Sequence, residues 1–193
     1  MKTNTKNTTN HGFTLIEMVG VLAVIAILAA LLVPKIFAAI NDSRISSAVS
    51  SVNACKTATM SYFGKTAAFP TTNSFDGVLV GEKLMDQLLN CKIAETSSAA
   101  EVVPIAITTV AGLDGKGTGF SLDGTTPITG VKVVYIKLEG VTASDAKELS
   151  RRIDGDDATL TPADEAVEDF LGRVTHAVPA AGVTDVYIYL AHK

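Results

Sequence analysis

Residue types that carry chemistry are scarce in this chain of 193 residues. It holds three histidines, two cysteines and no tryptophan. No histidines and cysteines stand at the spacing of a metal site, and neither a phosphate-binding glycine loop nor a hydrolase nucleophile pattern is present. The sequence therefore predicts a structural or binding protein rather than an enzyme, with no organic cofactor.

Basic side chains are also too few for a nucleic-acid surface. The chain has 16 lysines and arginines against 20 acidic residues, for a net charge of −4. The largest local group of bases is a small one at Lys147, Arg151 and Arg152. Because nucleic-acid binding normally needs a broad basic stripe, the sequence argues against nucleic acid as a partner.

Charge is nearly absent between residues 13 and 33, where Glu17 is the only charged side chain. A helix of about 21 residues is roughly 31 Å long, the thickness of a bilayer core. The segment is thus expected to span a membrane. Pro34, at its end, removes a backbone donor and should bend the helix. A glutamate one turn inside such a span is costly in lipid, so Glu17 is expected to have a function.

The residues before this segment resemble a known processing site. Residues 1–12 contain Lys2 and Lys6 but no acid, and they end at Gly12. Gly12-Phe13-Thr14-Leu15-Ile16-Glu17 resembles the site at which type IV prepilins and type II secretion pseudopilins are cleaved. In that family, a membrane peptidase cuts after the glycine and methylates the new amino terminus, which is Phe13 here.

The resemblance implies the fold and the domain boundaries. It covers about the first 70 residues. The expected fold is α+β, a pilin-like lollipop in which one long helix packs on a small, mainly antiparallel sheet with short helices. The expected divisions are a leader at 1–12, a membrane and filament-core helix at 13–33, its amphipathic continuation at 34–66 and a globular head at 67–193.

The resemblance also implies how the chain assembles. The positive amine of a neighbour's Phe13 would stabilise the charged form of Glu17 and form an intersubunit salt bridge. The implied partners are copies of the chain, the prepilin peptidase and an inner-membrane assembly platform. The implied location is a single pass in the bacterial inner membrane with a periplasmic head, followed by a periplasmic pseudopilus or a surface pilus.

Local patterns predict the elements after Pro34. Apolar residues at helical spacing carry the long helix to about Phe63, with Gly64 as its stop. Thr142 and Asp145 form a capping-box pattern for a helix over 142–153. Further helices are expected at 81–89 and 162–171, and strands at 102–110, with Pro104 at a sheet edge, and at 120–122, 131–138, 173–178 and 183–190.

The two cysteines leave two interpretations open. Cys55 and Cys91 are compatible with one disulfide in an oxidising compartment. They are equally compatible with two buried free thiols.

An acidic run offers a candidate calcium site. On a twelve-residue EF-hand loop beginning at Asp154, Asp156 takes the third position and Glu165 the twelfth. However, Ala158 falls at the fifth position, and Thr159 replaces the glycine that the turn requires. A solvated acidic turn is the preferred interpretation. The glycine-rich run Asp114–Gly119 is read as a flexible hairpin loop.

The sequence thus predicts a subunit of a type IV pilus-like filament, with a type II secretion pseudopilin preferred. Two alternatives remain. One is a periplasmic binding or enzymatic domain on an uncleaved signal anchor, and the other is a DNA-uptake pilin with a basic patch.

Overall fold

The computed structural model describes residues 12–69, 75–89, 91, 93, 103–104, 108–109, 120–128, 132–157, 159–162 and 164–192. The leader and the Asp114–Gly119 run lie outside these residues. The chain divides into an amino-terminal unit, residues 1–42, and a carboxyl-terminal unit, residues 43–193. Each unit is described by itself below.

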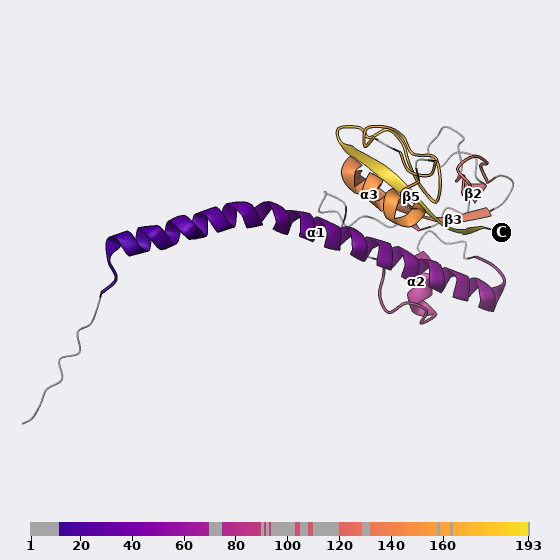
Figure 1. Cartoon of the computed structure of the whole chain (residues 1–193). Helices are drawn as coiled ribbons and strands as arrows, with labels where there is room; N and C mark the ends of the chain where they lie inside the picture. Colours follow the sequence, from indigo (N-terminus) through magenta and orange to yellow (C-terminus); the bar gives the residue numbers. More distant parts are fainter. Residues whose placement is uncertain are drawn as a thin grey trace, which may run out of the picture. The chain divides into compact units, whose positions relative to one another are not determined.

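One helix, α1 (Leu15–Thr66), includes Pro34 and contributes to both units (Figure 1). The predicted long helix is confirmed, but its predicted stop at Gly64 is wrong. The helix continues to Thr66, and the Ala67 amide still donates to the Phe63 carbonyl at 2.8 Å. Ala67 then takes a left-handed conformation with φ of 55° and ends the helix. The Thr66 hydroxyl donates to the carbonyls of Tyr62 and Ala68, so a side chain helps to cap this end.

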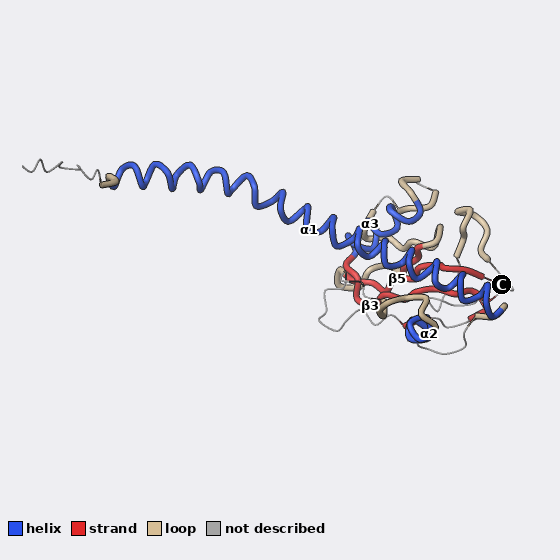
Figure 2. The backbone as a smooth tube through the Cα atoms, turned by 90° about the horizontal axis from the view of Figure 1, so that it is seen from below, coloured by secondary structure: helices blue, strands red, loops and turns tan. Residues whose placement is uncertain are grey.

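The carboxyl-terminal unit contains a five-stranded antiparallel sheet. Its two long strands are β3 (Lys132–Thr142) and β5 (Val183–His192), which pair with each other (Figure 2). The short strand β4 (Val174–His176) pairs with β5. Two further short strands, β1 (Val103–Pro104) and β2 (Thr108–Thr109), pair with β3. The order β1-β3-β5-β4 leaves β1 at an edge, which confirms the edge position predicted from Pro104.

The two faces of this sheet carry different side chains. Ile136 and Ile188 are opposite each other on one face and join the main core. Tyr135 and Tyr189 are opposite each other on the other face and pack with Phe120 in a smaller aromatic cluster. This separation follows from the alternation of side chains along a strand. The main core also receives buried residues of α1, namely Ile45, Ala48, Val52, Cys55 and Ala58.

The strand β3 runs directly into helix α3 (Ala143–Asp154). Thr142, the last strand residue, has extended dihedral angles, and its hydroxyl accepts a hydrogen bond from the Asp145 amide at 3.2 Å. The predicted helix start is therefore confirmed. Ala146 and Leu149 are fully buried and place α3 on the same face of the sheet as α1.

The helix predicted over 81–89 is wrong. The helix in this region, α2 (Phe75–Gly81), ends where the predicted one was to begin. Lys83 takes a left-handed φ of 57°, and the amides of Leu84 and Met85 both donate to the carbonyl of Leu79. Leu88, inside the predicted helix, is 57% exposed.

Two more predictions are corrected. The helix predicted over 162–171 is wrong, since the described part of this segment forms turns. The side chains of Asp164 and Asp169 each accept a hydrogen bond from the backbone amide two residues ahead. The backbone of Asp169 then forms an isolated antiparallel β-bridge with the backbone of His176. The strand predicted at 120–122 is only an isolated bridge from Ser121 to Gly172.

Candidate functional site

The amino-terminal end of α1 is capped by side chains of its own first turn. Gly12, Phe13 and Thr14 precede the helix, and Thr14 occupies the N-cap position. The Thr14 hydroxyl accepts from the Glu17 amide at 3.3 Å, while Glu17 Oε2 accepts from the Thr14 amide at 2.8 Å and from its hydroxyl at 2.7 Å. This reciprocal arrangement is a capping box. The sequence analysis missed the role of Thr14, although the Thr-x-x-Glu spacing signals it.

The capping box fixes where the Glu17 carboxylate lies. Both Thr14 bonds use Oε2, and among the described residues no donor reaches Oε1. The carboxylate is thus held at the amino-terminal end of the helix, where backbone N–H groups and the helix dipole favour an anion. One of its oxygens remains available to an external donor.

The helix that follows is apolar and uncovered in the amino-terminal unit. Phe13, Leu15 and Ile16 are each more than 70% exposed, and large apolar side chains continue to Ile40. An 18-residue window of α1 reaches a mean hydropathy of 2.8 and is long and apolar enough to cross a membrane. Such a surface is unfavourable in water and fits burial in lipid or against other helices.

Comparison with known proteins agrees with this geometry. Residues 7–33 match the family model described as the prokaryotic N-terminal methylation motif. The chain carries the type IV pilin signature. The matched residues of this pilin-like chain include Gly12, Phe13 and Glu17, and the motif implies cleavage by a prepilin peptidase and assembly with like subunits. No curated protein and no solved structure matches the chain.

The structure places the remaining predicted amino-terminal residues simply. Gly12 and Phe13 are exposed and lie outside the helix, so the bond between them is in non-helical backbone. Pro34 lies inside α1, which stays helical on both sides of it. The bend predicted at Pro34 stays a prediction.

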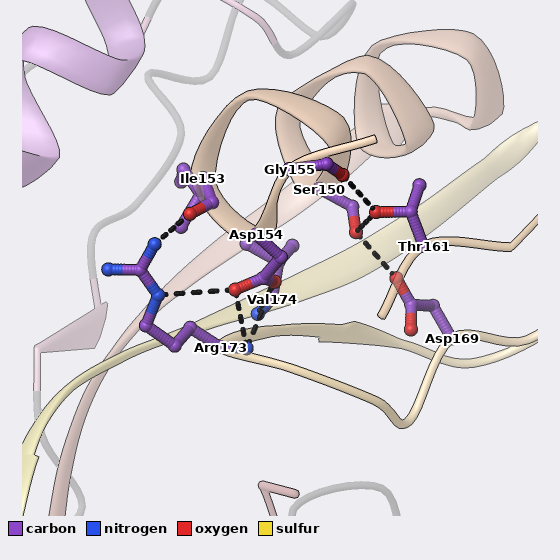
Figure 3. Close-up of polar contacts among 8 residues, drawn as sticks. All are labelled: Ser150, Ile153, Asp154, Gly155, Thr161, Asp169, Arg173 and Val174. Atoms are coloured by element: carbon purple, nitrogen blue, oxygen red, sulfur yellow. Dashed lines mark hydrogen bonds and ion pairs between the residues drawn. The ribbon is translucent and has the colours of Figure 1, made fainter. Parts of the chain in front are cut away.

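A buried polar cluster forms where α3 ends (Figure 3). The Asp154 side chain is 3% exposed and accepts hydrogen bonds from the amides of Arg173 and Val174, both at 2.9 Å. Arg173 Nε pairs with the same carboxylate at 3.2 Å, and its Nη2 donates to the Ile153 carbonyl. Gly172 makes room for this carboxylate, because a Cβ there would lie 2.6 Å from it. Asp154 therefore ties the end of α3 to the start of β4.

A second carboxyl group lies beside the first. Asp169 Oδ2 accepts from the Ser150 hydroxyl at 2.8 Å, and Oδ1 accepts from the Leu171 amide at 3.1 Å. Burial raises the pKa of Asp169 to about 7, and the nearby Asp154 carboxylate adds to the shift. Burial lowers the pKa of His176, whose Nε2 has no hydrogen-bond partner in the described part of the chain. Asp169 and His176 are buried, and the hydrogen bond from Ser150 to Asp169 fixes the segment before β4 to α3.

The three candidate calcium ligands differ in their surroundings, and the calcium hypothesis stays a prediction. The buried carboxylate of Asp154 already pairs with Arg173 and accepts a hydrogen bond from the Val174 amide, whereas Asp156 and Glu165 are exposed. Within the described residues, no three acidic, histidine or cysteine side chains gather as metal ligands would. An EF-hand would also need a second helix where 162–171 turns.

The two cysteines are brought into the same core. Cys55 on α1 and Cys91 after α2 are each 3% exposed, and both belong to the main core of the carboxyl-terminal unit. Both are free thiols in the structure.

Proposed function

We propose that the chain is a structural subunit of a type IV pilus-like filament, most consistent with a type II secretion pseudopilin. It is cleaved after Gly12, methylated at Phe13 and inserted in the inner membrane with its carboxyl-terminal unit in the periplasm. The observation that carries the proposal is the capping box of Glu17, set at the start of an exposed apolar helix inside the matched motif.

Assembly follows from the charge of this site. In lipid, the Glu17 carboxylate has its own Thr14 as partner. A neighbour's Phe13 amine would reach Oε1 and neutralise the charge of the carboxylate, which the hydrogen bonds from Thr14 leave uncompensated. The pair also fixes the axial position of one subunit relative to the next. An inner-membrane assembly platform would then add subunits one at a time.

The first experiment is an intact mass measurement of the protein purified from its own membranes. We expect a chain that begins at Phe13 and carries one added methyl group. A chain that still begins at Met1 in cells with an active prepilin peptidase would overturn the proposal. It would favour the alternative of a domain on an uncleaved signal anchor.

Glu17→Gln tests the ion pair separately from the helix cap. Glutamine retains a carbonyl that accepts from the Thr14 amide, but it carries no charge. Loss of one partner of a buried ion pair costs about 3–5 kcal/mol, so incorporation into sheared filaments should fall more than about tenfold while cleavage continues. Glu82→Gln, at an exposed position of the carboxyl-terminal unit, is the matched control. Equal incorporation of both variants would contradict the role of Glu17.

The phenotype of cells in which this chain is deleted distinguishes the kinds of filament. We expect loss of export of a secreted enzyme with surface pili retained. Loss of DNA uptake instead would indicate a DNA-uptake pilin. The local basic group disfavours that outcome, because Arg151 Nε and Arg152 Nε each pair with Glu148 at 2.8 Å.

A further inference from the structure

Cys55 and Cys91 lie in one tightly packed part of the carboxyl-terminal unit. Cys55 is on the buried face of α1, and its carbonyl accepts from the buried Thr59 hydroxyl at 2.8 Å. Cys91 follows Leu89, which is also buried in the main core. The two cysteines therefore share a core although 36 positions separate them in the sequence.

The segment that leads to Cys91 runs beside α1. Residues 84–89 line a cavity of about 300 Å³ together with Ser51 and Ala54 of α1. Ala54 is adjacent to Cys55, and Leu89 is two residues before Cys91. The chain thus lies beside the residue next to Cys55 shortly before it reaches Cys91.

The electrostatics of the thiols agree with this proximity. Burial raises the pKa of Cys55 to about 11. Burial raises the pKa of Cys91 to about 12, and the charge of a Cys55 thiolate contributes to that shift. Both thiols thus lie in a low-dielectric environment, and Cys91 is close enough to Cys55 for the charge of the Cys55 thiolate to affect its pKa. Both thiols are protonated at neutral pH and react slowly once buried.

We propose that Cys55 and Cys91 are the two halves of a disulfide that forms as the carboxyl-terminal unit folds. Two S–H bonds break, one S–S bond forms, and two protons and two electrons pass to a protein or small-molecule disulfide, which becomes a dithiol. Because the folded core hides both thiols, exchange takes place before the core closes. This timing rests on the proposed function, which puts the unit in an oxidising compartment during folding.

The bond would join α1 to the segment after α2. That segment bends away from helical geometry at Lys83 and is held to α2 by the Leu79 carbonyl, which accepts from two amides. A covalent link at Cys91 fixes its other end to α1. The cavity lined by Ser51, Ala54 and residues 84–89 then keeps a constant shape.

The test uses the full chain from its own membranes, with free thiols alkylated during lysis in denaturant. Trypsin releases Cys55 in residues 45–56 and Cys91 in residues 84–92, each with one cysteine. We expect one linked pair of peptides, lighter by two hydrogen atoms than the separate peptides. Both peptides alkylated, with no linked species, would overturn the proposal. The amino-terminal mass of the same sample reports processing independently, so failure of the disulfide and failure of the filament function are distinguishable.

A stability measurement supplies a second readout. Addition of a reductant that opens the bond should lower the melting temperature of the wild-type chain in detergent by on the order of 10 °C. The Cys55→Ser, Cys91→Ser double variant is the matched control, because its melting temperature should not respond to the reductant. An equal response of both proteins would contradict the bond.

Discussion

At the scale of single residues, Asp169 combines burial with a small number of hydrogen bonds. Its two acceptor contacts, from Ser150 and Leu171, come from uncharged donors, while the nearest charged group with an effect on it is the Asp154 carboxylate. Arg173 is directed at Asp154 rather than at Asp169. The neutral form of Asp169 is therefore favoured in the folded protein.

This arrangement predicts a pH dependence of stability. The pKa of Asp169 is about 7 in the folded state against 3.8 as its ordinary value, so the folded state binds the proton more tightly. The stabilisation is complete below about pH 4 and is lost as the pH rises through 7, by on the order of a few kcal/mol. His176 acts in the opposite direction, because burial lowers its pKa: its contribution to stability is complete above its ordinary pKa of 6.5 and is lost as the pH falls below that value.

Asp169→Asn isolates the aspartate. The amide mimics the protonated carboxyl, since it accepts from the Leu171 amide and donates to Ser150. We expect its urea unfolding free energy, measured between pH 4 and 8, to exceed that of the wild type at pH 8 and to converge with it near pH 4. Because His176 is common to both proteins, the difference reports Asp169. A constant difference across this range would contradict the assignment.

At the scale of the element, the start of α3 is stabilised by the hydrogen bond from the Asp145 amide to the Thr142 hydroxyl. Thr142 ends β3 and caps α3 at once, so the strand and the helix share one residue. Thr142→Ala should reduce the free energy of unfolding in urea by about 1 kcal/mol. Thr142→Ser keeps the hydroxyl and should stay within a few tenths of the wild type. Equal losses in the two variants would show that the cap contributes nothing.

The same element shows what could be predicted from the sequence. The cap at Thr142 and the strand around Val133 depend on neighbours a few residues away, so a local pattern is enough to predict them. The capping box at Glu17 is just as local, but the sequence analysis overlooked it. The helix predicted at 81–89 failed because two amides are captured by the Leu79 carbonyl and Lys83 turns left-handed. These are contacts that leucine spacing does not encode.

The buried polar cluster was beyond prediction for a related reason. Asp154 was considered as a calcium ligand, since its acidic neighbours in the sequence suggested a loop. Its partner Arg173 lies 19 residues away and meets it only because Gly172 carries no side chain. The pairing of Asp169 with His176 likewise forms across a turn that the pattern over 162–171 did not indicate.

At the scale of the whole molecule, the two units differ in what holds them together. The described residues of the amino-terminal unit are all exposed, and the first buried residue of α1 is Ile45. The main core is made by residues from Ile45 onward. The carboxyl-terminal unit thus has its own core, whereas the amino-terminal unit needs lipid or neighbouring subunits.

Truncation tests this division. A fragment of residues 43–193 should remain in solution without detergent and should melt within a few degrees of the full chain in detergent, as followed by circular dichroism. The full chain without detergent should aggregate, because its apolar helix is uncovered. A fragment that lacks a cooperative transition would show that the first 42 residues contribute to the core.

The spacing of the contacts along α1 has a geometric consequence. Side chains that α1 directs into the core recur at intervals of three and four residues, at Ile45, Ala48, Val52, Cys55, Thr59 and Tyr62, with Ala58 buried beside Thr59. This is a heptad repeat, whose 3.5-residue period falls short of the 3.6 residues of a helical turn, so the strip drifts by about 20° per heptad in the left-handed sense. Over these residues the drift reaches roughly 50°. The uncovered strip opposite drifts with it. In the proposed filament, a helix of a neighbouring subunit that follows this strip would wind around α1 with a left-handed supercoil.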